Sequence, residues 1–313
     1  MKVELIDTTA STVRNELTRM CQQMGGLTTG VVLNLVIMTD EADQYDALRA
    51  ATQAGREHPC QVLGVIARSG RRPRRLDGEV TVGENMPGQM VLLRIQGELN
   101  EHVESVVTPL LVPDTPVVIW WPGKAPRAPA TDPVGALGQR RITDAAADEQ
   151  PRSRLLELAA GYRPGDTDLS WTRTTTWRSL LAATLDRPYA EILEAAVVAE
   201  AENPSADLMA AWLARRLGVP VHQELSAGPG VTEARFVTGD GKIVISRADG
   251  RNATLSRPGE PDRFVALHRR ETAELLSEEL RRLDPDEVYG ETLAELTSED
   301  RAAARATGGQ PEE

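Results

Sequence analysis

Histidine is the residue type through which this chain could perform acid–base catalysis, and His58 is the best placed of its four histidines. It stands in the segment REHPCQV, between a predicted helix and a buried strand, where a general base could reach a pocket at a sheet edge. Alternatively, it could hydrogen-bond the last carbonyls of that helix. The other histidines have neither triad-like nor metal-like neighbours, and GxSxG is absent. We therefore expect no catalytic residue and no metal site, and keep His58 as a cleft or partner-contact candidate.

Two neighbouring arginines, Arg140 and Arg141, stand in the segment QRRITDA together with Asp144. Adjacent side chains of a strand point to opposite faces, so at most one guanidinium can point into a given cleft. Arg141 could form a buried pair with a carboxylate of this chain, or its planar fork could hold a carboxylate or phosphate of another molecule. The sequence leaves both interpretations open, and all three residues are candidates for a cleft or partner contact.

The segment DLSWTRTTTWRS gathers two tryptophans, two arginines and three consecutive threonines. On a helix, Arg173 and Trp177 are four residues apart and can stack, while Trp171 and Arg178 are seven apart and share a face. Tryptophan and arginine are enriched at binding hot spots, although large aromatic side chains also fill cores. These four residues are therefore candidates for a partner contact or an interdomain cleft, with core packing as the alternative.

Trp120 and Trp121 end the apolar run of PVVIWWPG, in a chain with only 4% aromatic residues. Side chains alternate between the two faces of a strand. We therefore expect one tryptophan to face the core and the other to face an interdomain cleft or a partner.

Phosphate-binding loops are not evident in the sequence. The segment GPGVTE has Glu233 where a GxGxxG motif requires its last glycine, and GxxxxGK[ST] is absent. The arginine-rich segment RSGRRPRR, residues 68–75, could dock an acidic surface or bind a sugar phosphate, or it could form a solvated, self-repelling loop. We therefore expect no cofactor.

The composition favours an acidic globular protein. The 313 residues, 41% of them hydrophobic, suit two domains. A net charge of -12 argues against binding nucleic acid or anionic membranes, and no apolar stretch is long enough to span a bilayer. Cys21 and Cys60 are too few for a disulfide framework or a zinc site, and we expect both thiols to be reduced and buried. We expect a cytoplasmic location.

The hydrophobic periodicity predicts an α/β (α+β) protein. In the N-terminal domain, residues 1–150, helical spacing at 11–24 and 41–57 alternates with apolar runs at 30–40 and 60–67. Residues 78–99 predict two strands around a turn at Pro87 and Gly88. We therefore expect a mixed sheet with βαβ units and flanking helices.

A linker is expected at 151–167, followed by an α+β domain at 168–284 and a helical or flexible tail at 285–313. One helix is predicted over 168–185, with Asp168 or Ser170 as its N-cap. Short alternating segments over 231–269 predict an antiparallel meander. A final helix over 269–283 is expected to cover the meander, and residues 300–313 are expected to fray.

Four segments together, REHPC, VVTPLLVPDTPVVIWWPG, RRITDA and DLSWTRTTTWRSLLA, resemble the OpcA family, the glucose-6-phosphate dehydrogenase assembly proteins. The resemblance implies a non-catalytic protein with an N-terminal and a C-terminal family domain. It further implies that the protein binds glucose-6-phosphate dehydrogenase, promotes its active oligomer and supports the oxidative pentose phosphate pathway. One alternative is an enzyme or sensor that binds a sugar phosphate between its domains, with Arg141 and Arg173 as phosphate forks. Another is a scaffold for an unrelated acidic complex.

Overall fold

A computed structural model of the chain describes residues 1–24, 30–68, 73–83 and 88–307. The chain forms two compact units that are interleaved along the sequence. Unit 1 comprises Met1–Ala147, Gly161–Asp168 and Glu271–Pro285, and unit 2 comprises Asp148–Ala160, Leu169–Arg270 and Asp286–Glu313. The sequence predicts domain boundaries at 150, 167 and 284, which divide the chain into consecutive segments. These boundaries stay a prediction.

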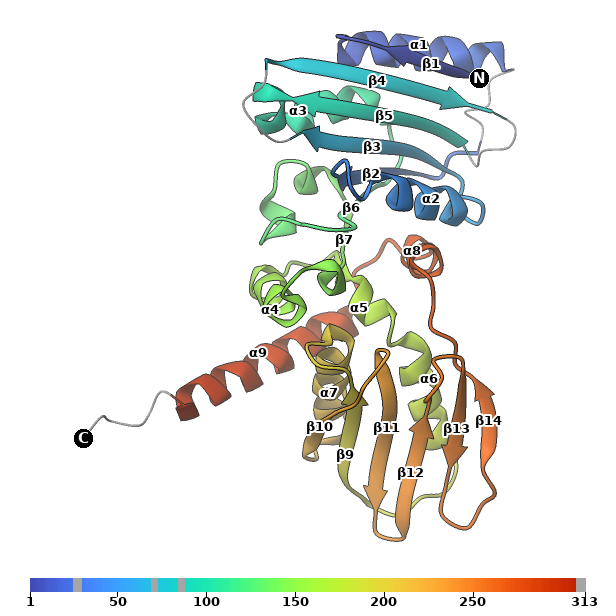
Figure 1. Ribbon diagram of the computed structural model, residues 1–313, viewed down its shortest axis with the longest axis vertical. Coiled ribbons are helices and arrows are strands. Elements are labelled where there is room, and N and C mark those ends of the chain that lie inside the picture. The colour runs from blue at the N-terminus through green and yellow to red at the C-terminus, as the bar shows by residue number, and fades with distance from the viewer. Residues whose placement is uncertain (25–29, 69–72, 84–87, 308–313) are drawn as a thin grey trace, which may run out of the picture. The chain divides into compact units, whose positions relative to one another are not determined.

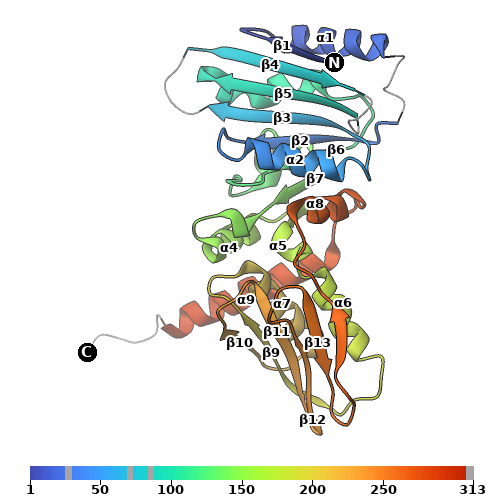
Figure 2. The same ribbon diagram turned by 45° about the vertical axis from the view of Figure 1, so that its right-hand side comes forward.

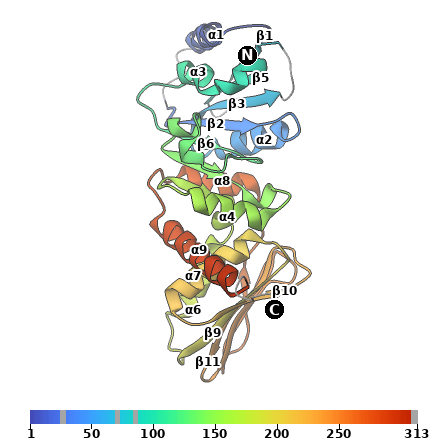
Figure 3. The same cartoon turned by 90° about the vertical axis from the view of Figure 1, so that its left-hand side faces the viewer.

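Unit 1 contains a large sheet with helices on both of its faces (Figures 1 and 3). Its strands are β1 (Lys2–Leu5), β2 (Leu33–Thr39), β3 (Cys60–Arg68), β4 (Arg75–Val82), β5 (Gly88–Gln96), β6 (Val117–Trp120), β7 (Arg140–Thr143) and β8 (Asp166–Asp168). Its α-helices are α1 (Ala10–Gln23), α2 (Gln44–Ala54), α3 (Val103–Val107) and α8 (Thr272–Leu280). Short 3-10 turns are η1 (Gly97–Glu101), η2 (Thr108–Leu110), η3 (Pro129–Thr131), η4 (Gly135–Leu137) and η5 (Ala145–Ala147).

The strand order of this sheet is β1-β4-β5-β3-β2-β6-β7-β8. The six strands from β5 to β8 in that order run parallel, and β4 and β1 add antiparallel partners at one edge. The parallel part has the order of the doubly wound dinucleotide fold, in which the first strand stands at the centre and the chain later crosses back to its other side. Here β2 is that first strand and β6 is its neighbour across the crossover.

The sequence explains this arrangement. The run LNLVIMT of β2 is apolar and mostly buried, as expected for a parallel strand covered on both faces. Helix α1 packs its buried stripe of Val13, Leu17 and Met20 into the core on one face, and Figure 3 shows α2 on the other face. The predicted βαβ unit and the mixed sheet are therefore confirmed. The predicted hairpin of β4 and β5 is also confirmed, although its turn at 84–87 lies outside the described residues.

Unit 2 has a six-stranded sheet in the order β10-β9-β11-β12-β13-β14, and Figure 2 shows α6 and α7 beside it. Its strands are β9 (Ile192–Ala199), β10 (Val221–Leu225), β11 (Val231–Thr238), β12 (Gly241–Ser246), β13 (Asn252–Ser256) and β14 (Arg263–Ala266). Its α-helices are α4 (Pro151–Gly161), α5 (Leu169–Thr172), α6 (Thr175–Thr184), α7 (Pro204–Leu217) and α9 (Glu287–Thr307). Strands β11 to β14 pair antiparallel, which confirms the predicted meander.

Helix α7 shows how local sequence fixes the element bounds. The side chain of Asn203 accepts a hydrogen bond from the Ala206 amide at 3.1 Å, and Pro204 occupies the first turn, where its missing N–H costs nothing. At the other end, Gly218 adopts a left-handed conformation with φ of 67°. Strand, helix and strand thus form a βαβ unit with β9 and β10 parallel.

The single helix predicted over 168–185 is wrong. Asp168 ends strand β8, and its carboxylate accepts hydrogen bonds from Thr143 Oγ1 at 2.6 Å and from the Ala145 amide at 2.9 Å. The helical part is split into α5 and α6, and Thr174, the N-cap residue of α6, donates its hydroxyl to the Trp171 carbonyl at 2.7 Å. The run of threonines therefore interrupts the helix, because β-branched hydroxyl side chains compete with the helical pattern.

The position predicted for the last amphipathic helix is also wrong. The helix forms as α8, but it belongs to unit 1, where it packs against α2 instead of covering the meander. Helix α9 continues to Thr307, through much of the segment expected to fray, and 308–313 lie outside the described residues. In the part of the chain that the structure describes, no helix combines the length and apolar character needed to cross a membrane.

Candidate functional site

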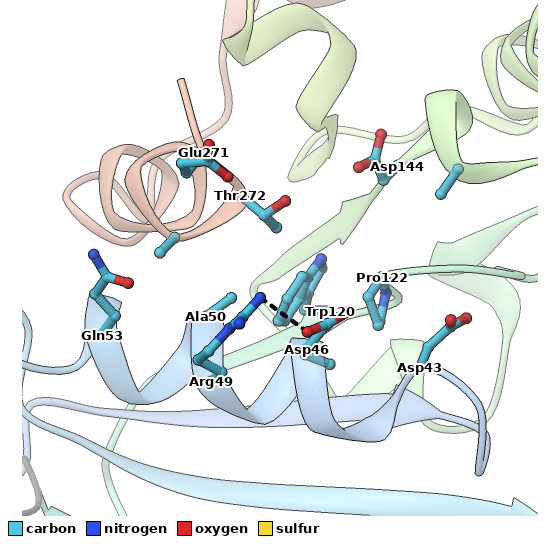
Figure 4. Close-up of a pocket in the computed structure, with 13 residues that line it drawn as sticks. Asp43, Asp46, Arg49, Ala50, Gln53, Trp120, Pro122, Asp144, Glu271 and Thr272 are labelled. Atoms are coloured by element: carbon cyan, nitrogen blue, oxygen red, sulfur yellow. Dashed lines mark ion pairs between the residues drawn. The ribbon is translucent and has the colours of Figure 1, made fainter. Parts of the chain in front are cut away.

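A crevice opens in unit 1 beside the carboxyl ends of β6 and β7, with a cavity volume of about 560 Å³. Helix α2, which follows β2, forms one wall, and the first residues of α8 form another (Figure 4). In open α/β sheets, the crevice outside the carboxyl ends of the strands at the crossover point is where ligands bind. The fold therefore marks this crevice as the candidate site before any of its residues is considered.

The crevice is acidic. Asp43, Asp46, Asp144 and Glu271 bring four carboxylates to its lining, and Arg49 brings one guanidinium. Arg49 is paired with Asp46 at 2.9 Å, which Figure 4 shows as a dashed line. The crevice therefore carries net negative charge at neutral pH.

Asp43 is the carboxylate of this crevice with the fewest internal contacts. It stands at the N-cap position of α2, where its side chain makes no capping hydrogen bond. Among the residues that the structure describes, its carboxylate has neither an ion-pair nor a hydrogen-bond partner, and Figure 4 shows it at the N-terminal end of α2. Its charge is therefore available to a bound molecule.

Trp120 forms the floor of the crevice at the end of β6. The residue is 0% exposed, and its indole Nε1 has no hydrogen-bond partner within the described part of the chain. Figure 4 shows this nitrogen facing the space between Thr272 and Asp144. Its neighbour Trp121 is buried in the hydrophobic core. The two tryptophans thus differ as alternation along a strand requires, one lining a crevice and the other packing in the core.

The residues of the crevice do not fit a dinucleotide. Such a cofactor places its pyrophosphate on free backbone amides of a glycine-rich turn after the first strand. Here the turn after β2 reads Asp-Glu-Ala-Asp at 40–43, and Asp40 Oδ1 already accepts hydrogen bonds from the amides of Ala42 at 2.8 Å and Asp43 at 3.0 Å. A phosphate would meet carboxylates instead of free amides.

Arg68 lies at the end of β3, where dinucleotide folds place the side chain that reads the ribose. Its guanidinium is paired with Glu41 of the acidic turn, with Nε 2.7 Å from Oε1. A carboxylate of the chain itself therefore faces this cation. Residues 69–72 of the arginine-rich segment 68–75 lie outside the described residues, and Arg75, which begins β4, is paired with Asp77 at 2.9 Å.

The side chains of Arg140 and Arg141 contact different partners, as predicted for neighbours on a strand. Arg140 is paired with Glu279 of α8 and donates to the Asp284 carbonyl at 3.1 Å. Arg141 is paired with Asp166 and also donates to the carbonyls of Gly138 and Pro164, each at 2.7 Å. Both guanidinium groups are buried and make internal contacts, which favours the structural interpretation of Arg141.

His58 lies at the opposite end of the parallel strands from the crevice. It precedes β3, at the amino end of the parallel strands, and is not among the residues that line the crevice. Its neighbour Glu57 contacts α8, accepting hydrogen bonds from the Ser277 hydroxyl at 2.8 Å and from Arg281 at 3.0 Å. These two donors hold the pKa of Glu57 below its ordinary value. The structure therefore does not bring His58 together with Trp120 or Asp144.

In unit 2, Trp171 and Arg178 lie together. The Arg178 guanidinium carbon is 3.5 Å from the centroid of the Trp171 ring, a stacked cation–π contact. The indole nitrogen of Trp171 donates to Asp286 at 2.8 Å, and its ring lies 5.7 Å from that of Tyr289. The sequence predicted only that these two residues share a helix face, and the structure brings them into contact, with the polar end of the tryptophan satisfied within unit 2.

Trp177 belongs to the hydrophobic core of unit 2. The guanidinium carbon of Arg247 lies 5.0 Å from the centroid of its ring, and burial lowers the pKa of this arginine. Arg173 is half-buried between α5 and α6. In unit 2, Trp171 is therefore in contact with Arg178, and Trp177 packs in the hydrophobic core. In unit 1, two sequence candidates, Trp120 and Asp144, line the crevice.

Several crevice residues were not among the sequence candidates: Asp43, Asp46, Arg49, Glu271 and Thr272. The signal that could have indicated some of them is the acidic turn that follows the buried run at 33–39. Glu271 and Thr272 come from a helix far along the chain, and no local pattern connects them to this turn. Within the described residues, no group of three or more metal-binding side chains is arranged to hold a metal ion.

The strand order and the position of the crevice define a doubly wound α/β domain with the topology of the dinucleotide-binding fold. The turn after its first parallel strand, where that fold holds a pyrophosphate, is acidic in this chain. The chain is similar in fold to KijD10, a 3-ketoreductase from Actinomadura kijaniata solved with TDP-benzene and NADP in an open conformation. That likeness has a TM-score of 0.51 and 12% identity, and covers 86% of this chain and 96% of that one. It is also similar to an NAD binding oxidoreductase from Klebsiella pneumoniae, with a TM-score of 0.50, 10% identity, and coverage of 87% and 97%. At such identities the likeness concerns the fold alone.

Two family models match the chain: the glucose-6-phosphate dehydrogenase subunit N-terminal domain over residues 51–160 and the corresponding C-terminal domain over 164–293. The chain therefore belongs to the OpcA family, as its sequence motifs indicated. The chain is 30% identical over 161 residues to a protein of Synechocystis sp.. The name of that protein describes it as the OxPP cycle protein OpcA. This match covers 46% of the chain and 32% of the relative, so it spans about a third of the relative's length.

Proposed function

We propose that this protein is a non-catalytic assembly factor that binds glucose-6-phosphate dehydrogenase, promotes its active oligomer and supports the oxidative pentose phosphate pathway in the cytoplasm. The observation that carries the proposal is the match to both domains of a glucose-6-phosphate dehydrogenase subunit, over 51–160 and 164–293. The acidic turn at 40–43 supports the non-catalytic part, because it offers carboxylates where a redox cofactor would need free amides.

Activation by such a subunit follows from linked equilibria. A binding protein shifts the dehydrogenase toward its active oligomer only by as much as it binds that oligomer more tightly than the other states. A rise in activity of about 5-fold to 150-fold corresponds to roughly 1–3 kcal/mol of coupling free energy. One interface of ordinary quality can supply that difference.

The sugar-phosphate alternative has less support. It assigned a phosphate to Arg141, whose guanidinium is buried and donates to Asp166 and to two backbone carbonyls. A phosphate at this position would have to displace all of these acceptors. A phosphate placed in the crevice of unit 1 instead would be repelled by the carboxylates that line it.

The proposal is tested by titrating the purified protein into glucose-6-phosphate dehydrogenase from the same source while NADPH formation is followed. We expect a saturable increase in rate and, in size-exclusion chromatography, a complex that contains both proteins. An unchanged rate without a complex would contradict the proposal. Binding of glucose 6-phosphate to the isolated protein, measured by calorimetry, would instead support the sugar-phosphate alternative.

A further inference from the structure

We infer that the acidic crevice of unit 1 receives an arginine side chain from a protein partner. The guanidinium lies against the carboxylate of Asp43, and a carbonyl of the same segment accepts a hydrogen bond from Trp120 Nε1. The inference deepens the proposed function and rests on it in one respect, that the partner is the dehydrogenase.

The charge of the crevice requires a cationic occupant. Four carboxylates line it, and its one guanidinium is already paired with Asp46. An anion such as a phosphate would be repelled, and the described residues do not form a metal-binding cluster. A guanidinium offers several donors in one plane and can bind a carboxylate through two of them, which suits the Asp43 carboxylate, since it has no internal partner in the described residues.

Trp120 provides a second, independent indication of a bound molecule. A buried N–H group without an acceptor is costly, and most buried polar groups are satisfied. The indole nitrogen of Trp120 has no partner among the described residues and faces the cavity between Thr272 and Asp144 (Figure 4). A bound segment that supplies a carbonyl oxygen there would satisfy this donor, whereas a bare cation would not.

The size of the site agrees with a side chain and its adjoining peptide group. The cavity of about 560 Å³ is open to solvent and is walled by α2 on one side and by α8 on another. Pockets of this volume are typical for ligands well above the size of an ion.

The first test measures how substitutions change affinity for the dehydrogenase. The Asp43 carboxylate has no internal partner, so Asp43→Lys keeps the fold, and we expect it to weaken binding about tenfold or more. The matched control is Glu101→Lys, the same charge reversal at an exposed position of unit 1 outside the crevice, which should stay within about twofold of the unsubstituted protein.

Trp120→Phe separates a binding role from a structural one. It removes the unsatisfied N–H and keeps an aromatic ring, so the inference expects weaker binding of the dehydrogenase in a protein that still melts cooperatively. A structural role alone would lower the melting temperature and leave the affinity of the folded fraction unchanged. Equal affinity of Asp43→Lys, Trp120→Phe and Glu101→Lys for the dehydrogenase would overturn the inference.

A second measurement needs no dehydrogenase and keeps the two proposals distinguishable. N-acetyl-arginine amide, which carries both a guanidinium and a carbonyl, is added to ¹⁵N-labelled protein, and the Trp120 indole signal, assigned with Trp120→Phe, is followed by NMR. We expect a saturable shift at millimolar concentration, and no shift with the neutral citrulline analogue. A shift without dehydrogenase binding would keep the crevice site and reject the proposed function. No shift, or the same shift with citrulline, would reject the crevice site.

Discussion

The guanidinium of Arg141 joins strand β7 to the segment that leads into β8. Its side chain and that of its partner Asp166 are each 9% exposed, and the guanidinium also donates to two backbone carbonyls. Asp166 in turn accepts a hydrogen bond from the Arg163 amide at 2.7 Å. A pair satisfied in this way is tolerated in the interior, whereas either member alone would be an uncompensated buried charge.

We therefore expect Asp166→Asn to lower the free energy of unfolding by about 3–5 kcal/mol, because it leaves the Arg141 charge buried without its counter-ion. Urea denaturation followed by circular dichroism measures this loss. The control is Asp46→Asn, which breaks the exposed pair with Arg49 and should change stability by less than about 1 kcal/mol. Equal losses in the two variants would contradict the buried-pair argument.

The thiol of Cys60 lies at the start of β3, between β2 and β5, and is 0% exposed. Burial raises its pKa to about 12, because the thiolate is poorly solvated there. We expect Cys60 to react with thiol reagents only as fast as the protein unfolds, since the thiolate is the reactive form. Mass spectrometry of labelled protein with and without urea tests this, and rapid labelling of Cys60 in the native state would contradict it.

The same shift gives a pH dependence of stability. The pKa of the Cys60 thiol is higher in the folded state than in the unfolded state, so the folded protein keeps this proton to a higher pH. The contribution of the thiol to stability therefore falls as the pH rises above about 9. The loss is about 1.4 kcal/mol for each pH unit between the two pKa values. The stability difference between the protein and Cys60→Ala should therefore shrink from pH 8 to pH 10, measured by urea denaturation at both values.

At the scale of elements, Gly218 ends helix α7 with φ of 67°, and a Cβ added there would meet no atom within 4 Å. Space is therefore available, and only the backbone conformation opposes a side chain. We expect Gly218→Ala to destabilise the protein by about 1–2 kcal/mol and Gly218→Asn by less, because asparagine tolerates the left-handed region. Thermal melts of the two variants measure the difference, and equal losses would show that the helix end does not impose this conformation.

The predicted elements succeeded where the pattern is local. The buried run of β2, the amphipathic stripe of α1 and the alternation of β11 to β14 each follow from short stretches of sequence. The single helix expected over 168–185 failed because the run of threonines splits it into α5 and α6, where the Thr174 hydroxyl donates to the Trp171 carbonyl. Helix α8 was predicted as an element, but its neighbour could not be, since its contacts with α2 span more than two hundred residues.

The crevice depends on the same kind of long-range information. Trp120 and Asp144 were sequence candidates, Trp120 as the last residue of strand β6 and Asp144 as the residue that follows strand β7. That they line one crevice with α2 follows only from the strand order, in which β6 lies beside β2 and β7 beside β6. Periodicity predicts strands but not their order, so the acidic turn at 40–43 is visible in the sequence but cannot be placed beside Trp120 and Asp144 from it.

At the scale of the whole molecule, the two units exchange segments along the chain. Glu271–Pro285 returns to unit 1 after the sheet of unit 2 is complete. This returning segment supplies Glu279, the partner of buried Arg140, and Glu271 and Thr272, which line the crevice. A fragment that ends before residue 271 would therefore lack both a buried counter-ion and one wall of the candidate site.

The fold resembles that of a protein solved with NADP and that of an NAD binding oxidoreductase, yet the amides at the start of α2 are occupied by Asp40 and the cation at the end of β3 is paired with Glu41. We therefore expect about 1 mM NADP⁺ to leave the melting temperature unchanged within about half a degree, whereas a dissociation constant of about 10 μM would stabilise the protein by about 2.7 kcal/mol. The dehydrogenase alone serves as the positive control in the same melts. A rise of several degrees would contradict the argument, because a pyrophosphate could bind here only if Asp40 released the amides of Ala42 and Asp43 and the carboxylates beside them were neutralised.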